Sequence, residues 1–521
     1  MKTLALAGRI GLAFALALAS APLPSAVAQT TSEPAALIDQ IIVRYRNAEG
    51  VGAQGLLDLT TGAVDVGQTF GVQLRYVREA GDGALIVALS QSLTAPTAEQ
   101  LTTALEASPN VLYAEPDYRD FAYLTPGDSL YAQQWSLAAP AASAFGMNLE
   151  AAWDLTTGDP DLVVAVIDTG ILPTHPDLVG RTVPGYDFVT DPVNAGDSDG
   201  RDADPTDPGD WTVDDQCGAG WDGGPSSWHG THVAGIVSAS ADNAQGVTGV
   251  NWGSRVQALR VLGKCGGMSS DIADAIRWAA GVPVPGTPAN PTPARVINLS
   301  LGGVRPCSTT YQTAIDAARA AGAVVVVAAG NSAMDTVYVT PANCVGVLTV
   351  GATDRSGNLA SYSNFGTTLD LAAPGGDMTF WGDPDGILST YNNGSTNAGT
   401  MSYDYLQGTS MAAPQVAGVA SLVISANPFL SPDSVAAILI GTLTPLPVGS
   451  QCLSGCGQFT PPPCATTTCG PGIPNAAAAI TLAQSLDEYV YLPALAQEGV
   501  AATSASLGAS ASLGASASLD R

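Results

Sequence analysis

Short apolar segments that alternate with helix-like segments restrict the fold of this chain more than any other feature. Residues 162–167, 295–299 and 323–328 are each short, rich in β-branched side chains and largely apolar on both faces. Helix-like segments such as 270–280 and 308–321 separate them. Strands that are apolar on both faces and are joined by helices form a parallel sheet that is covered on each side. We therefore expect an α/β domain with a mostly parallel sheet.

The segment that precedes this domain, residues 29–124, is predicted to form a small α+β unit. Apolar strand candidates lie at 41–45, 84–89 and 111–117, and a helix candidate lies at 97–107. Pro96, followed by a capping box of Thr97 and Gln100, indicates where that helix begins. Polar residues follow the last strand, and a proline-glycine turn comes after them. These features predict a domain boundary near residues 122–125.

The charge balance excludes two classes of partner. The chain carries 18 Lys and Arg against 46 Asp and Glu, which gives a formal charge of −28. A surface of this sign repels the phosphates of nucleic acids and the headgroups of anionic lipids. With 521 residues, 46% of them hydrophobic, the chain is too apolar to be disordered and too long for one ordinary domain. We expect a globular monomer with no nucleic-acid or membrane partner.

Residues 1–28 have the three parts of a secretory signal peptide. Lys2 and Arg9 form a basic start, residues 10–19 are an apolar run, and residues 26–28 form a small-residue cleavage site. No later stretch reaches about 18 uninterrupted apolar residues, the length that spans a bilayer. The sequence therefore predicts a secreted, extracellular protein. Residues 487–521 form a low-complexity tail of Ala, Ser, Leu and Gly.

The cysteines of an exported chain are expected to form disulfides, here up to four. Zinc binding is the alternative, and it is disfavoured because no histidine lies near the last four cysteines. Those four belong to a proline- and cysteine-rich insert at residues 444–470. The eight cysteines are Cys217, Cys265, Cys307, Cys344, Cys452, Cys456, Cys464 and Cys469.

Three segments carry side chains suited to catalysis. Asp168 follows the first apolar strand, and sites in open α/β sheets lie at that end of the strands. His229 opens the motif HGTHVAG and is one of three histidines, with His175 and His232. Ser410 lies in the motif GTSMAAP at the start of a helix-like segment. Taken singly, such an Asp or Ser is more often a cap or turn residue, and such a His is as often structural as catalytic.

Together the three segments supply a carboxylate, a general base and a nucleophile. Their sequences and their order along the chain resemble the signature blocks of the subtilisin-like serine proteases, for which this order is known. The resemblance covers about residues 128–486 and implies a three-layer fold. It implies that Ser410 attacks a peptide carbonyl, His229 moves the proton and Asp168 orients the imidazole. Asn331, at the end of VVAAGN, would donate to the oxyanion, and the other two histidines would be structural.

Two further segments resemble the substrate-binding parts of that family. Ser300, Leu301 and Gly302 follow an apolar strand and would pair with an extended peptide. Ala329 and Gly330 would form a wall of the specificity pocket. These segments contain no acidic residue, so the sequence does not indicate a strict preference for basic substrate side chains.

The resemblance also implies bound calcium, an ion that takes about six to eight oxygen ligands. The ligands would be side chains of Asp128, Asp177 and Asn243 and carbonyls of Ala241, Gln245 and Val247. A second candidate is the acidic loop that contains Asp197, Asp199, Asp202 and Asp204. So many like charges would repel at close range without a cation, and a solvated acidic loop is the alternative.

The unit at residues 29–124 resembles a family prosegment in its position, its size and its closing sequence YAEPD. The resemblance implies a ferredoxin-like α+β fold for this unit. Such prosegments assist folding and inhibit the enzyme by occupying its substrate cleft. Relatives that contain cysteines suggest two pairs, Cys217 with Cys265 and Cys307 with Cys344. The segment from residue 475 to 486 resembles the closing helix of the family. This resemblance places the insert inside a catalytic domain of residues 125–486.

The leading hypothesis is a secreted, calcium-stabilised serine endopeptidase that is made as a self-processed precursor. A lipase or esterase of the α/β-hydrolase type would need the motif Gly-x-Ser-x-Gly in the order Ser, Asp, His, whereas Ala412 stands two residues after Ser410. A catalytically silent binding protein on the same scaffold is the second alternative. Such a protein would usually have lost a residue of the triad, and this chain has lost none.

Overall fold

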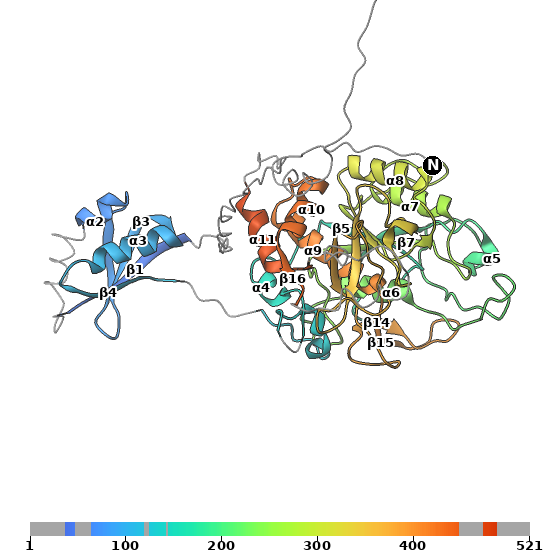
Figure 1. The fold of residues 1–521 in the computed structure, drawn as a ribbon, viewed down its shortest axis with the longest axis horizontal. Coiled ribbons are helices and arrows are strands. Elements are labelled where there is room, and N and C mark those ends of the chain that lie inside the picture. Colours follow the sequence, from blue (N-terminus) through green and yellow to red (C-terminus); the bar gives the residue numbers. More distant parts are fainter. Residues whose placement is uncertain (1–36, 47–63, 119–123, 142–143, 448–471, 487–521) are drawn as a thin grey trace, which may run out of the picture. The chain divides into compact units, whose positions relative to one another are not determined.

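The computed structural model describes residues 37–46, 64–118, 124–141, 144–447 and 472–486 (Figure 1). Contacts divide the chain into two compact units, Met1–Asp117 and Tyr118–Arg521, which we call the small unit and the large unit. The expected signal peptide, the tail and the last four cysteines lie outside the described residues, as does most of the insert.

The small unit is an antiparallel sheet packed against two helices. Its elements are β1 (Leu37–Tyr45), α2 (Val64–Thr69), β2 (Leu74–Glu79), β3 (Leu85–Thr94), α3 (Ala95–Glu106) and β4 (Val111–Pro116). The strand order β2-β3-β1-β4 and the succession βαββαβ are those of the ferredoxin-like arrangement. The expected capping box is wrong. Helix α3 starts two residues earlier with Thr94 as its N-cap, because Pro96 is tolerated within the first helical turn.

The core of the large unit is a seven-stranded parallel sheet. Its strands are β5 (Val163–Asp168), β6 (Thr182–Asp187), β7 (Arg255–Arg260), β8 (Val296–Leu299), β10 (Val324–Ala328), β12 (Leu348–Thr353) and β13 (Leu371–Pro374). They lie in the order β13-β12-β10-β8-β5-β7-β6, and each pairing is parallel. Every residue of β5, β8 and β10 is buried, as expected for strands that are apolar on both faces.

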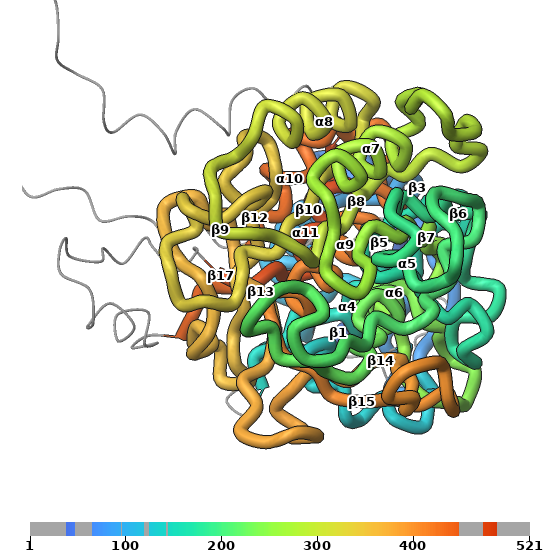
Figure 2. Tube along the Cα trace, turned by 90° about the vertical axis from the view of Figure 1, so that its right-hand side faces the viewer, coloured from blue at the N-terminus to red at the C-terminus, as the bar shows by residue number. Residues whose placement is uncertain are grey.

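Helices cover both faces of this sheet and make three layers (Figure 2). One face carries α7 (Ser269–Ala279) and α8 (Thr309–Ala320). The other carries α4 (Leu149–Trp153), α6 (His229–Ser238), α9 (Thr409–Ala426), α10 (Pro432–Gly441) and α11 (Ala476–Ser485). Side chains of β5 alternate between the layers: Ile167 packs with α7 and α8, whereas Val166 packs with α6 and α9. The expected three-layer α/β fold is confirmed.

Helix α9 is the apolar centre of its layer. In the part of the chain that the structure describes, it is the one helix long and apolar enough to cross a membrane, but 83% of its 18-residue window is buried inside the structure. That burial is typical of a core helix.

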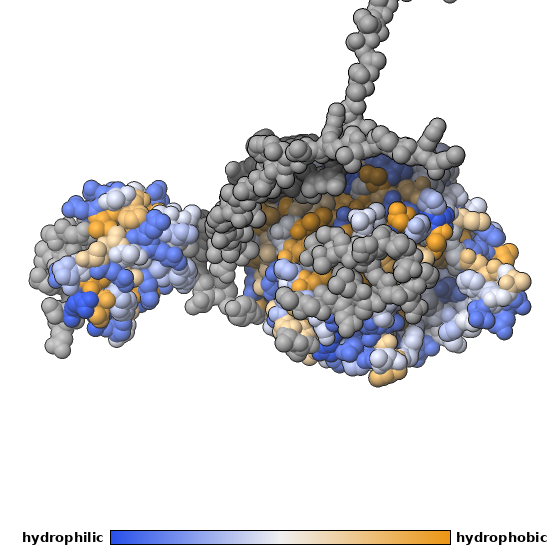
Figure 3. All heavy atoms as spheres, in the orientation of Figure 1, coloured by the Kyte–Doolittle hydropathy of each residue, from blue (hydrophilic) through white to orange (hydrophobic). Residues whose placement is uncertain are grey.

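Short antiparallel pairs and single turns complete the large unit. The pairs are β9 (Gly303–Val304) with β11 (Val339–Thr340), β14 (Ile387–Asn392) with β15 (Met401–Leu406), and β16 (Leu443–Pro445) with β17 (Gly472–Pro474). The remaining elements are α5 (Pro192–Ala195), η2 (Tyr131–Gln133), η3 (Trp135–Leu137) and η4 (Thr336–Tyr338). Many residues around α5 are hydrophilic (Figure 3), and the aspartate-rich loop follows this helix.

Candidate active site

The ends of three neighbouring strands bring candidate residues to one edge of the sheet. Asp168 is the last residue of β5, Ser300 follows β8 directly, and Asn331 lies three residues after β10. These strands are adjacent and parallel, so their carboxyl ends meet at this edge. His229 and Ser410 are the first residue of α6 and the second residue of α9. The two helices pack in one buried cluster, which keeps their first turns near the same edge.

Asp168 and His229 form a direct pair. His229 Nδ1 donates to Asp168 Oδ1 over 2.7 Å, and the carboxylate side chain is 1% exposed whereas the imidazole is 23% exposed. Burial lowers the pKa of His229, but the carboxylates of Asp168, Asp210 and Asp207 together outweigh it, so that the net pKa lies above the usual 6.5. The bond assigns the proton of the neutral ring to Nδ1 and leaves Nε2 as an acceptor.

The start of α9 is tied to the end of β8 through two serines. Ser410 Oγ donates to the carbonyl of Ser300 over 3.2 Å, and Ser300 Oγ donates to the carbonyl of Ser410 over 2.8 Å. In this conformation the Ser410 hydroxyl therefore bonds to Ser300 and not to His229. Transfer of its proton to His229 requires the hydroxyl to turn away from Ser300.

The amide of Asn331 is fixed by the residue that precedes the candidate nucleophile. Asn331 Oδ1 accepts from the N–H and the hydroxyl of Thr409, over 2.9 and 2.8 Å. The same hydroxyl accepts from Gly330 N over 3.0 Å. Because the oxygen of the amide is held by Thr409, its Nδ2 remains available as a donor on the side of the cavity that Asn331 and Ser410 both line.

A cavity of about 240 Å³ lies beside Ser410. Of the predicted substrate residues, Ser300, Leu301, Gly302 and Gly330 line it. Ala329 does not: it is fully buried, and its carbonyl accepts from Asn364 Nδ2 over 2.7 Å. Successive residues at a strand end face opposite sides, so that Gly330 can face the cavity while Ala329 faces the interior. The other lining residues are Gly303, Val304, Ala328, Asn331, Ser332, Val339, Asn364 and Thr409.

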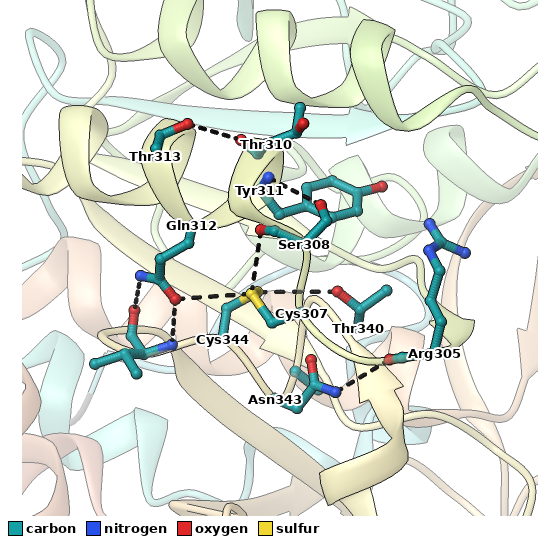
Figure 4. Close-up of a disulfide and its surroundings, with 12 residues drawn as sticks. Arg305, Cys307, Ser308, Thr310, Tyr311, Gln312, Thr313, Thr340, Asn343 and Cys344 are labelled. Atoms are coloured by element: carbon teal, nitrogen blue, oxygen red, sulfur yellow. Dashed lines mark hydrogen bonds between the residues drawn. A yellow bond between two sulfur atoms is a disulfide. The ribbon is translucent and has the colours of Figure 1, made fainter.

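A disulfide joins Cys307 and Cys344 close to the strands that form part of the cavity wall (Figure 4). It joins the segments that follow β9 and β11, the two strands whose residues Val304 and Val339 pair with each other and line the cavity. Gln312 of α8 holds the chain directly after Cys344, because its side chain bonds to both the N–H and the carbonyl of Val345. The second disulfide, Cys217–Cys265, is also present, so both expected pairs are confirmed.

The first candidate calcium loop folds around two buried carboxylates. Asp128 accepts from the N–H groups of Asp242 and Asn243 over 2.8 and 3.0 Å. Asp177 accepts from Asn243 Nδ2 over 2.9 Å and from Val247 N over 3.0 Å. Two carboxylates and the carbonyls of this loop are oxygen donors of the kind that Ca²⁺ prefers. Among the described residues, no three His, Cys, Asp or Glu side chains are grouped as a metal site, so carbonyl and amide oxygens would complete the ligands.

The second candidate loop uses its carboxylates differently. Asp197 pairs with Arg260, and Asp202 accepts from the N–H of Asp204 over 2.7 Å. Asp204 accepts in turn from Thr206 N, while burial and the charges of Asp202 and Asp197 raise the pKa of Asp199. These side chains are not grouped as a metal site in the described part of the chain. Backbone N–H groups and an arginine therefore hold this acidic loop, and the second calcium site stays a prediction.

The other two histidines bind main-chain atoms. His175 Nε2 bonds to the carbonyl of Ser402 over 2.9 Å, and His232 Nε2 bonds to that of Asp404 over 3.1 Å. Both residues are fully buried, and burial lowers the pKa of His232 to about 3. They are therefore neutral side chains that connect β15 to the rest of the unit.

Asn364 is a site residue that was absent from the sequence prediction. Its Oδ1 accepts from the N–H groups of Ser332 and Met334, each over 3.0 Å, and its Nδ2 holds Ala329. It therefore shapes the segment that carries Asn331. An isolated Asn gives no signal in one sequence, because its role depends on segments that meet only in the folded chain.

Comparison with known proteins places this geometry in a family. A profile of the Subtilase family, peptidase S8, matches residues 159–458. An extracellular protease of Xanthomonas campestris pv. campestris is 47% identical over 411 residues, which cover 79% of this chain and 66% of that protein. An extracellular basic protease of Dichelobacter nodosus is 40% identical over 413 residues, covering 77% of this chain and 66% of that protein. The matches span just under two thirds of these relatives' own lengths.

Solved structures agree with the sequence matches. A structure of a protease from Pseudoalteromonas arctica PAMC 21717 is 48% identical, with a TM-score of 0.64, and the match covers 69% of this chain and 100% of that one. The family profile spans more than half of the present chain and includes Asp168, His229, Asn331 and Ser410. The chain belongs to the Subtilase family, peptidase S8.

Proposed function

We propose that this protein is a secreted serine endopeptidase that cleaves peptide bonds through an acyl-enzyme. One observation carries the proposal: the Asp168–His229 pair stands at the sheet edge where Ser410 and Asn331 share a cavity. A nucleophile, an oriented base and an amide donor around one cavity are the parts that acyl transfer needs. The relatives named as extracellular proteases support both the activity and the secretion.

The base and the nucleophile act in sequence. When a peptide binds, the Ser410 hydroxyl turns from Ser300 to His229 Nε2, donates its proton there and attacks the carbonyl carbon. Asp168 stabilises the imidazolium and keeps Nδ1 protonated, because its carboxylate is buried against that nitrogen. His229 then gives its proton to the leaving amine, and a water molecule repeats the cycle on the acyl-enzyme.

Asn331 contributes where negative charge develops. Its amide oxygen is bound by Thr409, so Nδ2 is held for the oxyanion without reorganisation. The backbone N–H of Ser410, at the start of α9, supplies the second donor. The N-terminal end of a helix also carries a partial positive charge, which favours an oxyanion.

The cavity lining suggests which substrate side chains fit. All thirteen lining residues are uncharged, and glycines form part of the wall. A Cβ on Gly330, where φ is +101°, would lie 2.5 Å from Asn364 Nδ2, so a larger residue here would disturb the wall. We expect uncharged substrate side chains before the cleaved bond, and little activity after Lys or Arg.

Two further roles belong to this proposal. The ferredoxin-like small unit, with the segment up to about residue 124, serves as a prosegment that assists folding and inhibits the enzyme. One calcium ion binds between Asp128, Asp177 and the loop 241–247, where it offsets the repulsion between two buried carboxylates. That ion supplies stability and takes no part in the chemistry.

Hydrolysis of fluorogenic peptides by the processed protein tests the function. We expect turnover of peptides with an apolar residue before the cleaved bond, and no turnover by the Ser410→Ala variant. The same variant should still bind peptides, because the cavity is unchanged. A wild-type protein that binds peptides but does not cleave them would establish the alternative, a catalytically silent binding protein.

A further inference from the structure

Asp207 is a buried carboxylate that the mechanism above does not use. It is 2% exposed, and both of its oxygens are bound. Oδ2 accepts from Thr169 Oγ1 and Oδ1 accepts from Gly209 N, each over 2.8 Å. Burial raises the pKa of Asp207 to about 7. Burying a carboxylate costs free energy, so a buried aspartate at this position indicates a functional role.

The hydroxyl of Thr169 connects Asp207 to the candidate base. A hydroxyl has one proton, and Thr169 gives it to Asp207. Its oxygen is thereby left to accept from Gly230 N over 3.0 Å, at the residue that follows His229. The backbone N–H of Thr169 donates to Asp168 Oδ1 over 2.8 Å, the oxygen that also holds the imidazole. Thr169 therefore binds Asp168 and the residue that follows His229, and Asp207 fixes the direction of its hydroxyl.

The first turn of α6 and the end of β5 are closely packed. A Cβ on Gly230 would lie 2.1 Å from the carbonyl of Gly170 and 3.2 Å from Asp168 Cβ. The first turn of α6 is therefore pressed against the end of β5. A small shift of the Thr169 side chain would change the distance between His229 and Asp168, because that side chain lies at the same contact.

We propose that Asp207 is a positioning residue: through Thr169 it holds Asp168 and the first turn of α6 in register, and its negative charge favours the protonated form of His229. This inference rests on the proposed function only for its kinetic consequences. The position of Asp207 and its effect on His229 can be measured in a protein that has no activity.

The charges that surround the pair set the sign of the effect. His229 faces the carboxylates of Asp168, Asp210 and Asp207, which all raise its pKa. His232, on the same helix, is neutral because burial keeps its pKa low. Asp207 itself also faces Asp210 and the guanidinium of Arg260. Removing the charge of Asp207 should therefore lower the pKa of His229, whereas a merely structural disturbance has no fixed sign.

The test uses Asp207→Asn and NMR of the imidazole resonances. The chain has three histidines, and burial lowers the pKa of both His175 and His232, so the signal of His229 can be assigned by its titration. We expect the pKa of His229 to fall by about half a unit, less than the 1–3 units of a carboxylate in direct contact. Asp222→Asn removes an exposed charge from the loop before α6 and should leave the pKa within about 0.1 unit.

Kinetics provide the second readout. Because Asp207 has a pKa of about 7 and its charge raises the pKa of His229, the two titrations are coupled. We therefore expect the wild-type acid limb of kcat/KM to depart from a one-proton curve, and that of Asp207→Asn to be a one-proton curve at lower pH. Asp207→Asn should lower kcat about tenfold with KM nearly unchanged, since a lost alignment affects the reacting groups and not substrate binding.

Variants of Thr169 keep the proposal testable if Asp207→Asn does not fold. Thr169→Ser retains the hydroxyl and should keep the wild-type kcat and pH profile. Thr169→Val removes the hydrogen bond to Asp207 but leaves its carboxylate in place, so it should lower kcat about as far as Asp207→Asn does. An unchanged or raised pKa of His229 in Asp207→Asn, or equal kcat values for the two Thr169 variants, would overturn the proposal. A wild-type protein without turnover would contradict the proposed function alone, because the NMR shift would still be measurable.

Discussion

Replacing Asn331 separates the stabilisation of the oxyanion from the stability of the fold. In Asn331→Ala the transition state loses one hydrogen bond, and we expect kcat to fall about a hundred- to a thousandfold, the size that removal of the corresponding amide produces in subtilisin itself. KM should change little, because Nδ2 meets the oxyanion and not the ground-state carbonyl. The N–H and hydroxyl of Thr409 also lose their acceptor, which should lower the free energy of unfolding by about 1–3 kcal/mol.

Asn331→Asp distinguishes the two effects. It keeps an oxygen for Thr409, so the stability should remain close to that of the wild type, but it places an acceptor where the oxyanion needs a donor. Its kcat should fall at least as far as that of Asn331→Ala. Asn397→Ala, at an exposed asparagine, is the matched control. The assay is initial-rate hydrolysis of a fluorogenic peptide beside thermal unfolding. A kcat within about threefold of wild type in Asn331→Asp would refute the assigned role.

Three further predictions address pH, calcium and maturation. Burial lowers the pKa of His229, but the carboxylates of Asp168, Asp210 and Asp207 together raise it above 6.5. Because the base must be neutral, kcat/KM should fall as pH drops below an apparent pKa above 6.5; a flat profile from about pH 5 to 8 would contradict this. A calcium chelator should lower the unfolding temperature of the wild type and change that of Asp177→Asn much less; equal responses would exclude the proposed ligand. Ser410→Ala should keep residues 40–117 covalently attached whereas the wild type should lose them, as N-terminal sequencing can show; cleavage of the variant in a host without secreted proteases would exclude self-processing.

The predictions from sequence were most accurate where the role of a residue depends on residues next to it in the chain. The apolar segments 162–167, 295–299 and 323–328 became β5, β8 and β10 within one residue at each end, since strands that are buried on both faces leave a continuous apolar run. Asp168, at the end of such a strand, could be placed from the same pattern. Helix α8 was also bounded closely, because Ser308 is an N-cap whose side chain accepts from Tyr311 N.

The predictions were weakest where a role depends on contacts across the chain. Asp207 binds Thr169 from 38 residues away, and Asn364 binds Ala329 from 35 residues away. Neither contact follows a local periodicity, so neither could be predicted from the sequence. Ala329 was assigned to the pocket wall although it faces the interior, because sequence alone does not tell on which side a strand ends. The pairing of Asp197 with Arg260 of β7 has no sequence signal either.

Labelling with a serine-directed fluorophosphonate tests the central claim most directly, since it reports the reactive hydroxyl without reference to any substrate. The processed protein should gain one label, which peptide mass spectrometry should locate on Ser410. The rate of labelling should fall steeply in His229→Ala, because the hydroxyl then has no base. It should remain near the wild-type value in Ser485→Ala, a control at an exposed serine. A folded wild-type protein that takes up no label on Ser410 would contradict the account.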